Sequence, residues 1–315
     1  MVSPAVSVVM PVRDGQTFVD DAIRSIRAQS HHEIEFIVVD DGSRDGTRGI
    51  LDRHAADDPR IRIIAQPALG VVAGLNHGIE AASGSLIARM DADDIAKPER
   101  LARQVTALLQ HPKAALVGSG YEVIDGAGRV RRSASVPTSP GDIREALMHG
   151  NCIAHPTVLM RRDAVLAVGG YRRAFLQCED YDLWLRLSER HDLLNIDEPL
   201  LQYREHSAQL TWGHLEQRIL SELAARESAR WRSRGGSDPA DDMDPVTRRD
   251  LREFGLSDNE ILTQIVVRAL DAAREAGRAG NRPAVRRALS LAWRQKGLPW
   301  PLSLRFWVAC ARLLR

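Results

Sequence analysis

Short apolar runs alternate with amphipathic stretches along the first hundred residues. Four runs rich in Val, Ile and Leu are predicted to be strands, at residues 6–10, 34–39, 60–65 and 85–90. Between the first two runs, apolar residues recur at the spacing of one helix face, at Val19, Ala22, Ile23 and Ile26. The same spacing recurs between the third and fourth runs, at Leu75, Ile79 and Ala82. Strands that alternate with helices in this way predict an α/β fold with a mostly parallel sheet flanked by helices.

The remaining two thirds of the chain are predicted to hold helices and a few more strands. Helices are expected at residues 97–110, 142–148, 179–190 and 215–232. Short strands are expected within 114–136, joined by the turn-forming residues 125–128, and again at 157–160. Ser257 with Glu260 has the pattern of a capping box, and Asn281 with Pro283 begins another helix.

A cluster of turn-forming and acidic residues suggests where the chain divides. It covers residues 235–245 and contains no apolar period, which is typical of a linker. We therefore predict an α/β domain over residues 1–213, a helix with an acidic Gly/Pro linker over 214–245, and a basic helical region over 246–315. The last region resembles one helical hairpin of a repeat, and because a stable array needs about three repeats we predict an appendage.

Composition excludes several classes of protein. The chain has 315 residues, 44% of them hydrophobic, and 43 basic side chains against 42 acidic ones give a formal charge of +1. These values are typical of a soluble globular protein and argue against a disordered chain or a general nucleic-acid binder. The three cysteines, Cys152, Cys178 and Cys310, are far apart and form no Cys-x-x-Cys pair, so neither a disulfide framework nor a zinc site is expected. A cytoplasmic location fits this pattern.

The near-neutral total conceals a basic C-terminal segment. Residues 277–315 contain nine Lys or Arg and no Asp or Glu. No run reaches the roughly 18 apolar residues of a membrane span. Within 298–314, however, Trp and Phe alternate with Arg, which is typical of a helix lying on anionic lipid. Peripheral contact with the inner face of the plasma membrane is one interpretation, and packing of these aromatic residues on the protein or on a second subunit is the other.

Acidic residues follow the fourth predicted strand. Asp91 and Asp93 lie two apart on an extended segment, so both side chains can face one divalent cation. A diphosphate would be the natural source of the remaining ligands. The alternative is an acidic loop that caps the next helix, for which Asp94, close to Pro98, is well placed.

Further polar residues follow the first and second predicted strands. Pro11 and Arg13 follow the first, and Asp40 and Asp41 follow the second within Asp-Asp-Gly-Ser. In open α/β sheets ligands bind at the carboxyl ends of the strands. A carboxylate there can accept hydrogen bonds from a base or a ribose, although an Asp-Gly-Ser turn also occurs without a ligand.

Two later segments carry residues suited to acid–base or metal chemistry. Glu179 and Asp180 are predicted at a helix N-terminus, where the helix dipole stabilises negative charge. A carboxylate in this place can act as a general base if it faces a cleft, and is otherwise ordinary first-turn decoration. His206, within Tyr-Arg-Glu-His, can bind a metal or a phosphate or serve as a surface or core residue.

Taken in order, these motifs make the chain resemble the family 2 glycosyltransferases of the GT-A fold, over about residues 5–212. The resemblance rests on Val6–Pro11, Asp40–Ser43, Met90–Asp94, Glu179–Asp180 and Tyr203-Arg204-x-His206. Three further motifs are similar to the branch that builds bacterial capsular, exopolysaccharide and lipopolysaccharide sugars, namely Leu75-Asn76-x-Gly78-Ile79, Pro98-Glu99-Arg100-Leu101 and His155-Pro156-Thr157. The family has a Rossmann-like, mostly parallel sheet.

The resemblance implies inverting, metal-dependent transfer of a hexosyl or N-acetylhexosaminyl group. The donor would be a nucleotide-diphosphate sugar, with UDP as the expected nucleotide, and the acceptor a hydroxyl of a glycan or a lipid-linked sugar. The nucleotide-sugar would be bound by Pro11, Arg13, Asp40, Asp41, Asp91 and Glu179. Mn²⁺ or Mg²⁺ would be held by Asp91, Asp93 and His206, and Asp180 would deprotonate the acceptor. One departure is Pro67-Ala68-Leu69-Gly70, where many relatives carry a polar residue before a Gly-rich segment.

Other classes of protein fit the sequence less well. A sugar nucleotidyltransferase usually has a Gly-rich loop with a lysine after the first strand, and Pro11–Gly15 has neither. A phospho-receiver domain needs a lysine at the end of a later strand, and Lys97, Lys113 and Lys296 do not fit that place. A catalytically inactive relative that binds nucleotide-sugars stays open as an alternative.

Overall fold

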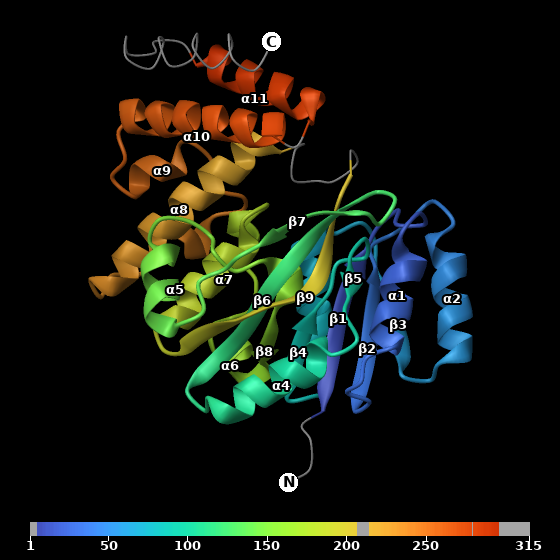
Figure 1. The fold of residues 1–315 in the computed structure, drawn as a ribbon. Helices are drawn as coiled ribbons and strands as arrows, with labels where there is room; N and C mark the ends of the chain where they lie inside the picture. The colour runs from blue at the N-terminus through green and yellow to red at the C-terminus, as the bar shows by residue number, and fades with distance from the viewer. Residues whose placement is uncertain (1–4, 207–213, 279, 296–315) are drawn as a thin grey trace. The chain divides into compact units, whose positions relative to one another are not determined.

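The computed structural model describes residues 5–206, 214–278 and 280–295 (Figure 1). The chain divides into two compact units, which we describe separately. The first contains Met1–Arg172 and Leu183–His206, and the second contains Arg173–Asp182 and Ser207–Arg315. The domain boundaries predicted after residues 213 and 245 stay predictions. Within the described ranges no helix combines the length and the apolar character needed to cross a membrane; the predicted interfacial segment 298–314 lies outside the described residues.

The first unit is built on one mixed sheet. The order of its strands is β3-β2-β1-β4-β8-β6-β9-β5, and β7 pairs with β6. The pairs β3–β2, β2–β1, β1–β4 and β6–β9 are parallel, and the pairs β4–β8, β6–β8, β6–β7 and β5–β9 are antiparallel. The strands are β1 Val6–Val12, β2 Ile34–Asp40, β3 Ile61–Ala65, β4 Leu86–Arg89, β5 Ile95–Ala96, β6 Ala114–Asp125, β7 Val130–Ala134, β8 Leu159–Arg161 and β9 Asp192–Glu205.

The four predicted N-terminal strands are confirmed and form the parallel part of the sheet. Their ends differ from the prediction by at most two residues, because strand ends fray. The strand β9 was not predicted. Its sequence is half polar and contains Pro199, where the pairing with β6 shifts register. A proline inside a strand normally argues against that assignment, and the irregularity explains how this strand accommodates it.

Helices cover both faces of the sheet (Figure 1). Alternate residues of β1, such as Val8 and Met10, belong to a buried core with apolar residues of α1, α2 and α4. The residue between them, Val9, faces α3 instead. The helices that the first unit contributes are α1 Val19–Arg27, α2 Thr47–Asp57, α3 Val71–Ala81, α4 Arg100–Gln110, α5 Pro140–Leu147 and α6 Arg162–Ala167. The helix α7, Glu179–Ser188, begins in the second unit and ends in the first.

A glycine allows α3 to approach β1 closely. A Cβ atom placed on Gly78 would lie 2.3 Å from Cγ1 of Val9 and 3.3 Å from its Cγ2. Val9 is itself buried, so it has little room to move away. Through this contact α3 packs closely on the face of β1 and β2.

The second unit is helical within its described residues. Its main helices are α8 Leu215–Ser233, α9 Asp250–Glu253, α10 Asp258–Arg278 and α11 Arg282–Arg294. The predicted capping box is confirmed, since the Ser257 amide donates to Glu260 at 2.8 Å and the Glu260 amide donates to the Ser257 hydroxyl at 3.3 Å. Asn281 caps α11 by accepting from the Ala284 amide. Within 235–245 most residues are exposed, while Asp238 is buried and pairs with Arg232 at 2.5 Å, next to the short helix Pro239–Asp242.

We predict that Gly78→Ala lowers the free energy of unfolding by roughly 1–3 kcal/mol, the usual effect of overpacking a core. Gly49→Ala is the matched control, because it lies within α2 and its Cβ would meet nothing within 4 Å. That change is expected to raise stability by about 0.5–1 kcal/mol through the better helix propensity of alanine. Urea unfolding of both variants measures the difference; equal stability of the two would contradict the close packing of α3 on β1.

Candidate active site

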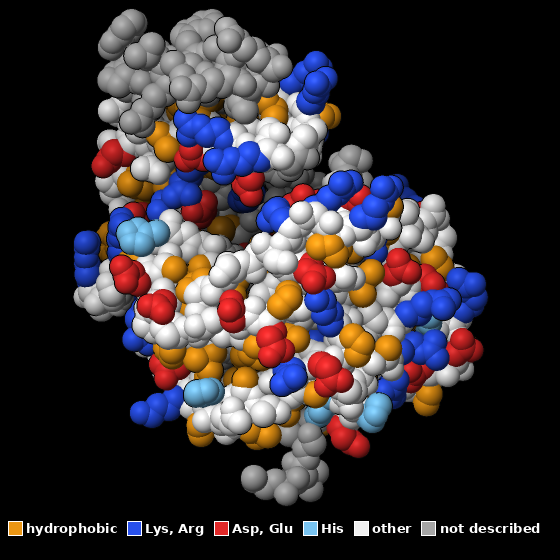
Figure 2. Space-filling view, in the orientation of Figure 1, with side chains coloured by type: hydrophobic (Ala, Val, Ile, Leu, Met, Phe, Trp, Pro, Cys, Tyr) orange, Lys and Arg blue, Asp and Glu red, His pale blue; other side chains and the backbone are white. Residues whose placement is uncertain are grey.

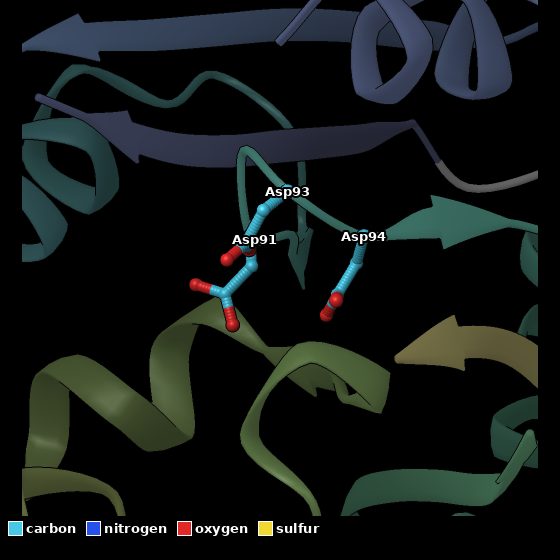
Figure 3. A group of neighbouring side chains, drawn as sticks. All are labelled: Asp91, Asp93 and Asp94. Atoms are coloured by element: carbon cyan, nitrogen blue, oxygen red, sulfur yellow. The ribbon is translucent and has the colours of Figure 1, made fainter. Parts of the chain in front are cut away.

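Three carboxylates meet in the loop between β4 and β5. Asp91, Asp93 and Asp94 each place an oxygen within 4.8 Å of the others (Figure 3). The loop exists because β4 ends at Arg89 and the chain turns before pairing again as β5. Asp91 and Asp93 therefore lie together, as the sequence predicted. We call these three residues the acidic triad.

Asp94 does not cap a helix, which corrects the alternative interpretation of this motif. The helix α4 begins at Arg100, and its N-cap is Glu99 with no side-chain hydrogen bond. The carboxylate of Asp94 instead accepts the backbone amide of Arg204 at 2.8 Å. Asp94 is completely buried, whereas a helix cap usually lies at the surface. Its place in the acidic triad was missed because an acidic residue directly after Asp93 looks like ordinary loop sequence.

The end of β9 holds the acidic triad from the other side. The guanidinium Nε of Arg204 donates to the carbonyl oxygen of Asp93 at 2.8 Å, and the same guanidinium lies 4.6 Å from the ring centre of Phe18. His206 brings Nε2 within 2.9 Å of Oδ2 of Asp93, and its ring also contacts Phe18. The predicted proximity of His206 and Asp93 is thus present in the structure.

Two buried arginines lie beneath the acidic triad. Arg89, 5% exposed, forms an ion pair with Asp91. Arg100, 0% exposed, donates to the carbonyl oxygen of Arg89 at 2.7 Å and to Gln104 at 3.1 Å. Burial, and then repulsion from Arg89, lowers the pKa of Arg100 to about 9. Because a guanidinium still carries its charge at neutral pH, these side chains partly neutralise the carboxylates above them.

The acidic triad has the properties of a divalent cation site. Burial and repulsion from Asp91 and Asp93 raise the pKa of Asp94 well above its ordinary value, and burial raises the pKa of Asp91 although Arg89 opposes this. Oδ2 of Asp94 is buried and has no hydrogen-bond partner among the described residues. Carboxylate oxygens are the preferred ligands of Mg²⁺ and Mn²⁺, and a cation would relieve both the repulsion and the unsatisfied oxygen. The residues therefore fit such an ion.

The residues predicted to bind the nucleotide lie at the carboxyl ends of two adjacent strands. β1 and β2 are parallel, with Val12 opposite Asp40, which places Pro11, Arg13, Asp40 and Asp41 at one sheet edge. The carboxylate of Asp40 accepts the Ser43 amide at 3.0 Å, so it shapes the Asp-Gly-Ser turn. These side chains form a polar edge of the kind at which α/β proteins bind ligands.

Asp41 also has a structural role that the sequence did not reveal. Its Oδ1 accepts from Gln66 at 2.6 Å and from the Leu69 amide at 2.8 Å, and its Oδ2 accepts from the Gly70 amide at 3.0 Å. Gly70 has a φ of +91°, a conformation that suits glycine, and it precedes the first turn of α3. Asp41 therefore fixes the segment 66–70, which leads into α3.

His155 and Tyr171 form a second polar cluster in the first unit. Nε2 of His155 lies 2.8 Å from the Tyr171 hydroxyl, and the His155 ring meets Trp184 edge to face at 5.8 Å. Burial, together with repulsion from Arg89, holds the pKa of His155 well below its usual value. Neutral His155 thus packs near the arginine that pairs with Asp91.

Glu179 and Asp180 occupy the first turn of α7, as predicted. Glu179 is 7% exposed, and the Asp180 carboxylate accepts the Tyr181 amide at 2.7 Å. Both residues belong to the second unit, whereas the acidic triad belongs to the first. Their roles toward a donor or an acceptor stay predictions.

The acidic triad and the polar residues lie at the carboxyl ends of strands in a mixed α/β sheet. This arrangement suits an enzyme that binds a nucleotide through a metal ion. Residues 7–169 match the family described as Glycosyl transferase family 2. The chain belongs to this family, as the resemblance of its motifs implied.

Individual relatives agree with this assignment. Over 209 residues the chain is 37% identical to EpsE of Bacillus subtilis (strain 168), which bears a provisional glycosyltransferase name; the match covers 65% of this chain and 74% of EpsE. It is 34% identical over 206 residues to the O-antigen biosynthesis glycosyltransferase WbnJ of Escherichia coli, covering 64% of this chain and 80% of WbnJ.

Solved structures share the fold. The mannosyltransferase PcManGT of Pyrobaculum calidifontis, determined with GDP-Man and Mn²⁺, superposes with a TM-score of 0.56 at 18% identity and covers 100% of this chain and 86% of its own. TarS 1–349 of S. aureus, determined with UDP-GlcNAc, gives a TM-score of 0.57 at 13% identity, covering 94% of this chain and 93% of its own. The predicted GT-A fold is confirmed.

We predict that Asp93→Ala abolishes the Mn²⁺-dependent part of nucleoside diphosphate binding and leaves the melting temperature of the metal-free protein within a few degrees. The Asp93 side chain is 29% exposed in a loop, so its loss removes a ligand and little packing. Asp52→Ala, an exposed carboxylate of α2 paired with Arg48, is the control and should bind normally. Calorimetric titration with and without EDTA measures both. Unchanged Mn²⁺-dependent binding in Asp93→Ala would refute the site.

Proposed function

We propose that the protein transfers a sugar, with inversion, from a nucleotide-diphosphate sugar to a hydroxyl of a glycan or lipid-linked acceptor in bacterial surface polysaccharide synthesis. The observation that carries this proposal is the acidic triad, with its buried, unsatisfied oxygen on Asp94, at the carboxyl edge of the sheet. Family membership supports the reaction class. The name of WbnJ and that of the amylovoran biosynthesis glycosyltransferase AmsE of Erwinia amylovora support the pathway.

The metal site would belong to Asp91, Asp93 and Asp94, with His206 beside Asp93. A bound Mg²⁺ or Mn²⁺ supplies a Lewis acid that neutralises charge developing on the diphosphate. Arg89 and Arg100 position the acidic loop from below, and Arg204 positions it from β9. The complex of PcManGT with GDP-Man and Mn²⁺ supports a metal-bound diphosphate.

The rest of the donor would lie along the ends of β1 and β2. Pro11, Arg13, Asp40 and Asp41 would line the base and ribose, and Glu179 would also contact the donor. UDP is the expected nucleotide, in line with the complex of TarS with UDP-GlcNAc, whereas PcManGT was determined with GDP-Man. The transferred group would be a hexosyl or N-acetylhexosaminyl unit.

Asp180 would act as the general base. It takes the proton of the acceptor hydroxyl while that oxygen forms a bond to the anomeric carbon and the bond from that carbon to the diphosphate oxygen breaks. A single displacement of this kind inverts the anomeric centre. The helix dipole at the start of α7 favours the carboxylate form from which a base must begin.

The nucleotide is tested by thermal shift with UDP, GDP, CDP, ADP and dTDP, each with Mn²⁺ and with EDTA. A ligand at 100 times its dissociation constant stabilises the protein by about 2.7 kcal/mol. We expect the largest shift with UDP and Mn²⁺, and its loss in EDTA. Stabilisation by GDP alone would reassign the nucleotide, and the absence of a metal-dependent shift with any diphosphate would overturn the proposed donor class.

We predict that Asp180→Asn lowers turnover by roughly 10²- to 10⁴-fold, because the amide cannot accept the proton. The donor dissociation constant should change little. Glu179→Gln is the matched variant from the same helix turn, and it should weaken donor binding more than Asp180→Asn does. Steady-state kinetics and calorimetry measure the two effects. Loss of donor binding with unchanged turnover in Asp180→Asn would make Asp180 a donor ligand and not the base.

A further inference from the structure

The exposed face of α11 is basic and carries a tryptophan. Ala284, Val285, Ala288, Leu289 and Ala292 are buried on the opposite face, which packs on α10. The residues left at the surface include four arginines, and they also include Trp293, which is 60% exposed. Figure 2 shows Lys and Arg side chains over the part of the surface formed by α10 and α11.

Helical spacing places these side chains together. Arg282, Arg286 and Trp293 are four and seven residues apart, so they lie along one line of the helix surface. Arg287 and Arg294, seven residues apart, lie along a second line about 100° further round the exposed side of the helix. With a rise of about 1.5 Å per residue, the helix presents this face over roughly 20 Å. We call these five side chains the α11 basic face.

The charge of this face is not compensated within the described part of the chain. None of its four arginines forms an ion pair with a described residue, whereas Arg274 on α10 pairs with Asp271 at 2.6 Å. Residues 277–295 contain five arginines and no acidic residue, although the whole chain carries a net charge of only +1. Positive charge has therefore been concentrated here.

We propose that the α11 basic face docks on an anionic lipid surface, with the headgroup phosphates as its ligands. Arginine matches phosphate with bidentate hydrogen bonds. Tryptophan is enriched at the membrane interface, where its ring is partly buried and its N–H stays hydrated, and here it lies in line with two of the arginines. Arginines along one helix are also the footprint of a nucleic-acid site. The exposed Trp293, in line with two of these arginines, is the feature that favours a lipid surface. Docking of this kind would suit an enzyme that acts on acceptors held at a membrane.

The interaction has a calculable size. One basic residue near an anionic surface strengthens binding roughly fivefold, so loss of two should weaken it about 30-fold. The electrostatic part is screened by salt, because the Debye length falls from about 10 Å at 0.1 M to about 3 Å at 1 M. The contribution of Trp293 comes from burial of apolar surface and should survive added salt.

Co-sedimentation of the full chain with phosphatidylglycerol/phosphatidylcholine vesicles, and with phosphatidylcholine alone, tests the proposal. We expect binding to the anionic vesicles only, about 30-fold weaker for Arg286→Ala/Arg287→Ala. Trp293→Ser should weaken binding by a factor that added salt does not remove. Arg48→Ala/Arg53→Ala, which removes two exposed arginines of α2, is the matched control and should bind like the unaltered chain. Thermal melts check that each variant is folded.

Four results would overturn the proposal. The first two are no binding of the chain to anionic vesicles and equal binding to anionic and neutral vesicles. The third is binding of Arg286→Ala/Arg287→Ala as tight as that of the unaltered chain. The fourth is a loss of vesicle binding in Arg48→Ala/Arg53→Ala as large as in Arg286→Ala/Arg287→Ala. Binding of a short duplex DNA is measured in a separate assay without lipid. If it binds through Arg286 and Arg287 and the vesicles do not, the partner is a nucleic acid. The assay contains no sugar donor, so its outcome is independent of the proposed function.

Discussion

Mutual repulsion among three carboxylates is the constraint on which the site depends. Asp91, Asp93 and Asp94 could not share one loop as fully charged groups without compensation, since like charges a few ångströms apart in a buried place disfavour ionisation. The protein compensates with Arg89 and Arg100 below the loop. The carboxylates still lie close enough to repel one another, and a divalent cation bound between them would relieve that repulsion.

The parallel half of the fold could be predicted from the sequence because its signals are local. Most residues of β1, β2 and β4 are apolar and buried, as expected for strands covered on both faces, whereas the edge strand β3 contains the exposed Arg62. The meeting of Asp91 with Asp93, and the shared edge of Asp40 and Arg13, then follow from strand direction alone. The metal-binding role of Asp93 and the nucleotide-binding role of the strand ends come from the same local reasoning, and Asp93→Ala and the nucleotide screen test them.

The parts that could not be predicted depend on contacts distant in sequence. β9 alternates polar and apolar residues irregularly and contains Pro199, so nothing local identifies it as a strand; its long pairing with β6 does. The positions of Arg204 and His206 depend on that pairing. The backbone contacts of Asp94 and Asp41 could not be predicted for a related reason, because a carboxylate that binds a distant backbone amide has the same sequence signature as one in a simple turn.

The dependence of His206 on β9 also has a consequence for the order in which the protein matures. The hydrogen bond between His206 and Asp93 joins residues 113 positions apart. Closing so long a loop is slow compared with the local pairing of β1 with β2, and on the ribosome it must wait until β9 has emerged. The nascent chain therefore carries its acidic loop for some time before His206 and Arg204 can reach it. A cation site that includes His206 would therefore be completed late, and a stalled or truncated chain that ends before β9 would have the carboxyl ends of β1 and β2 without the completed site.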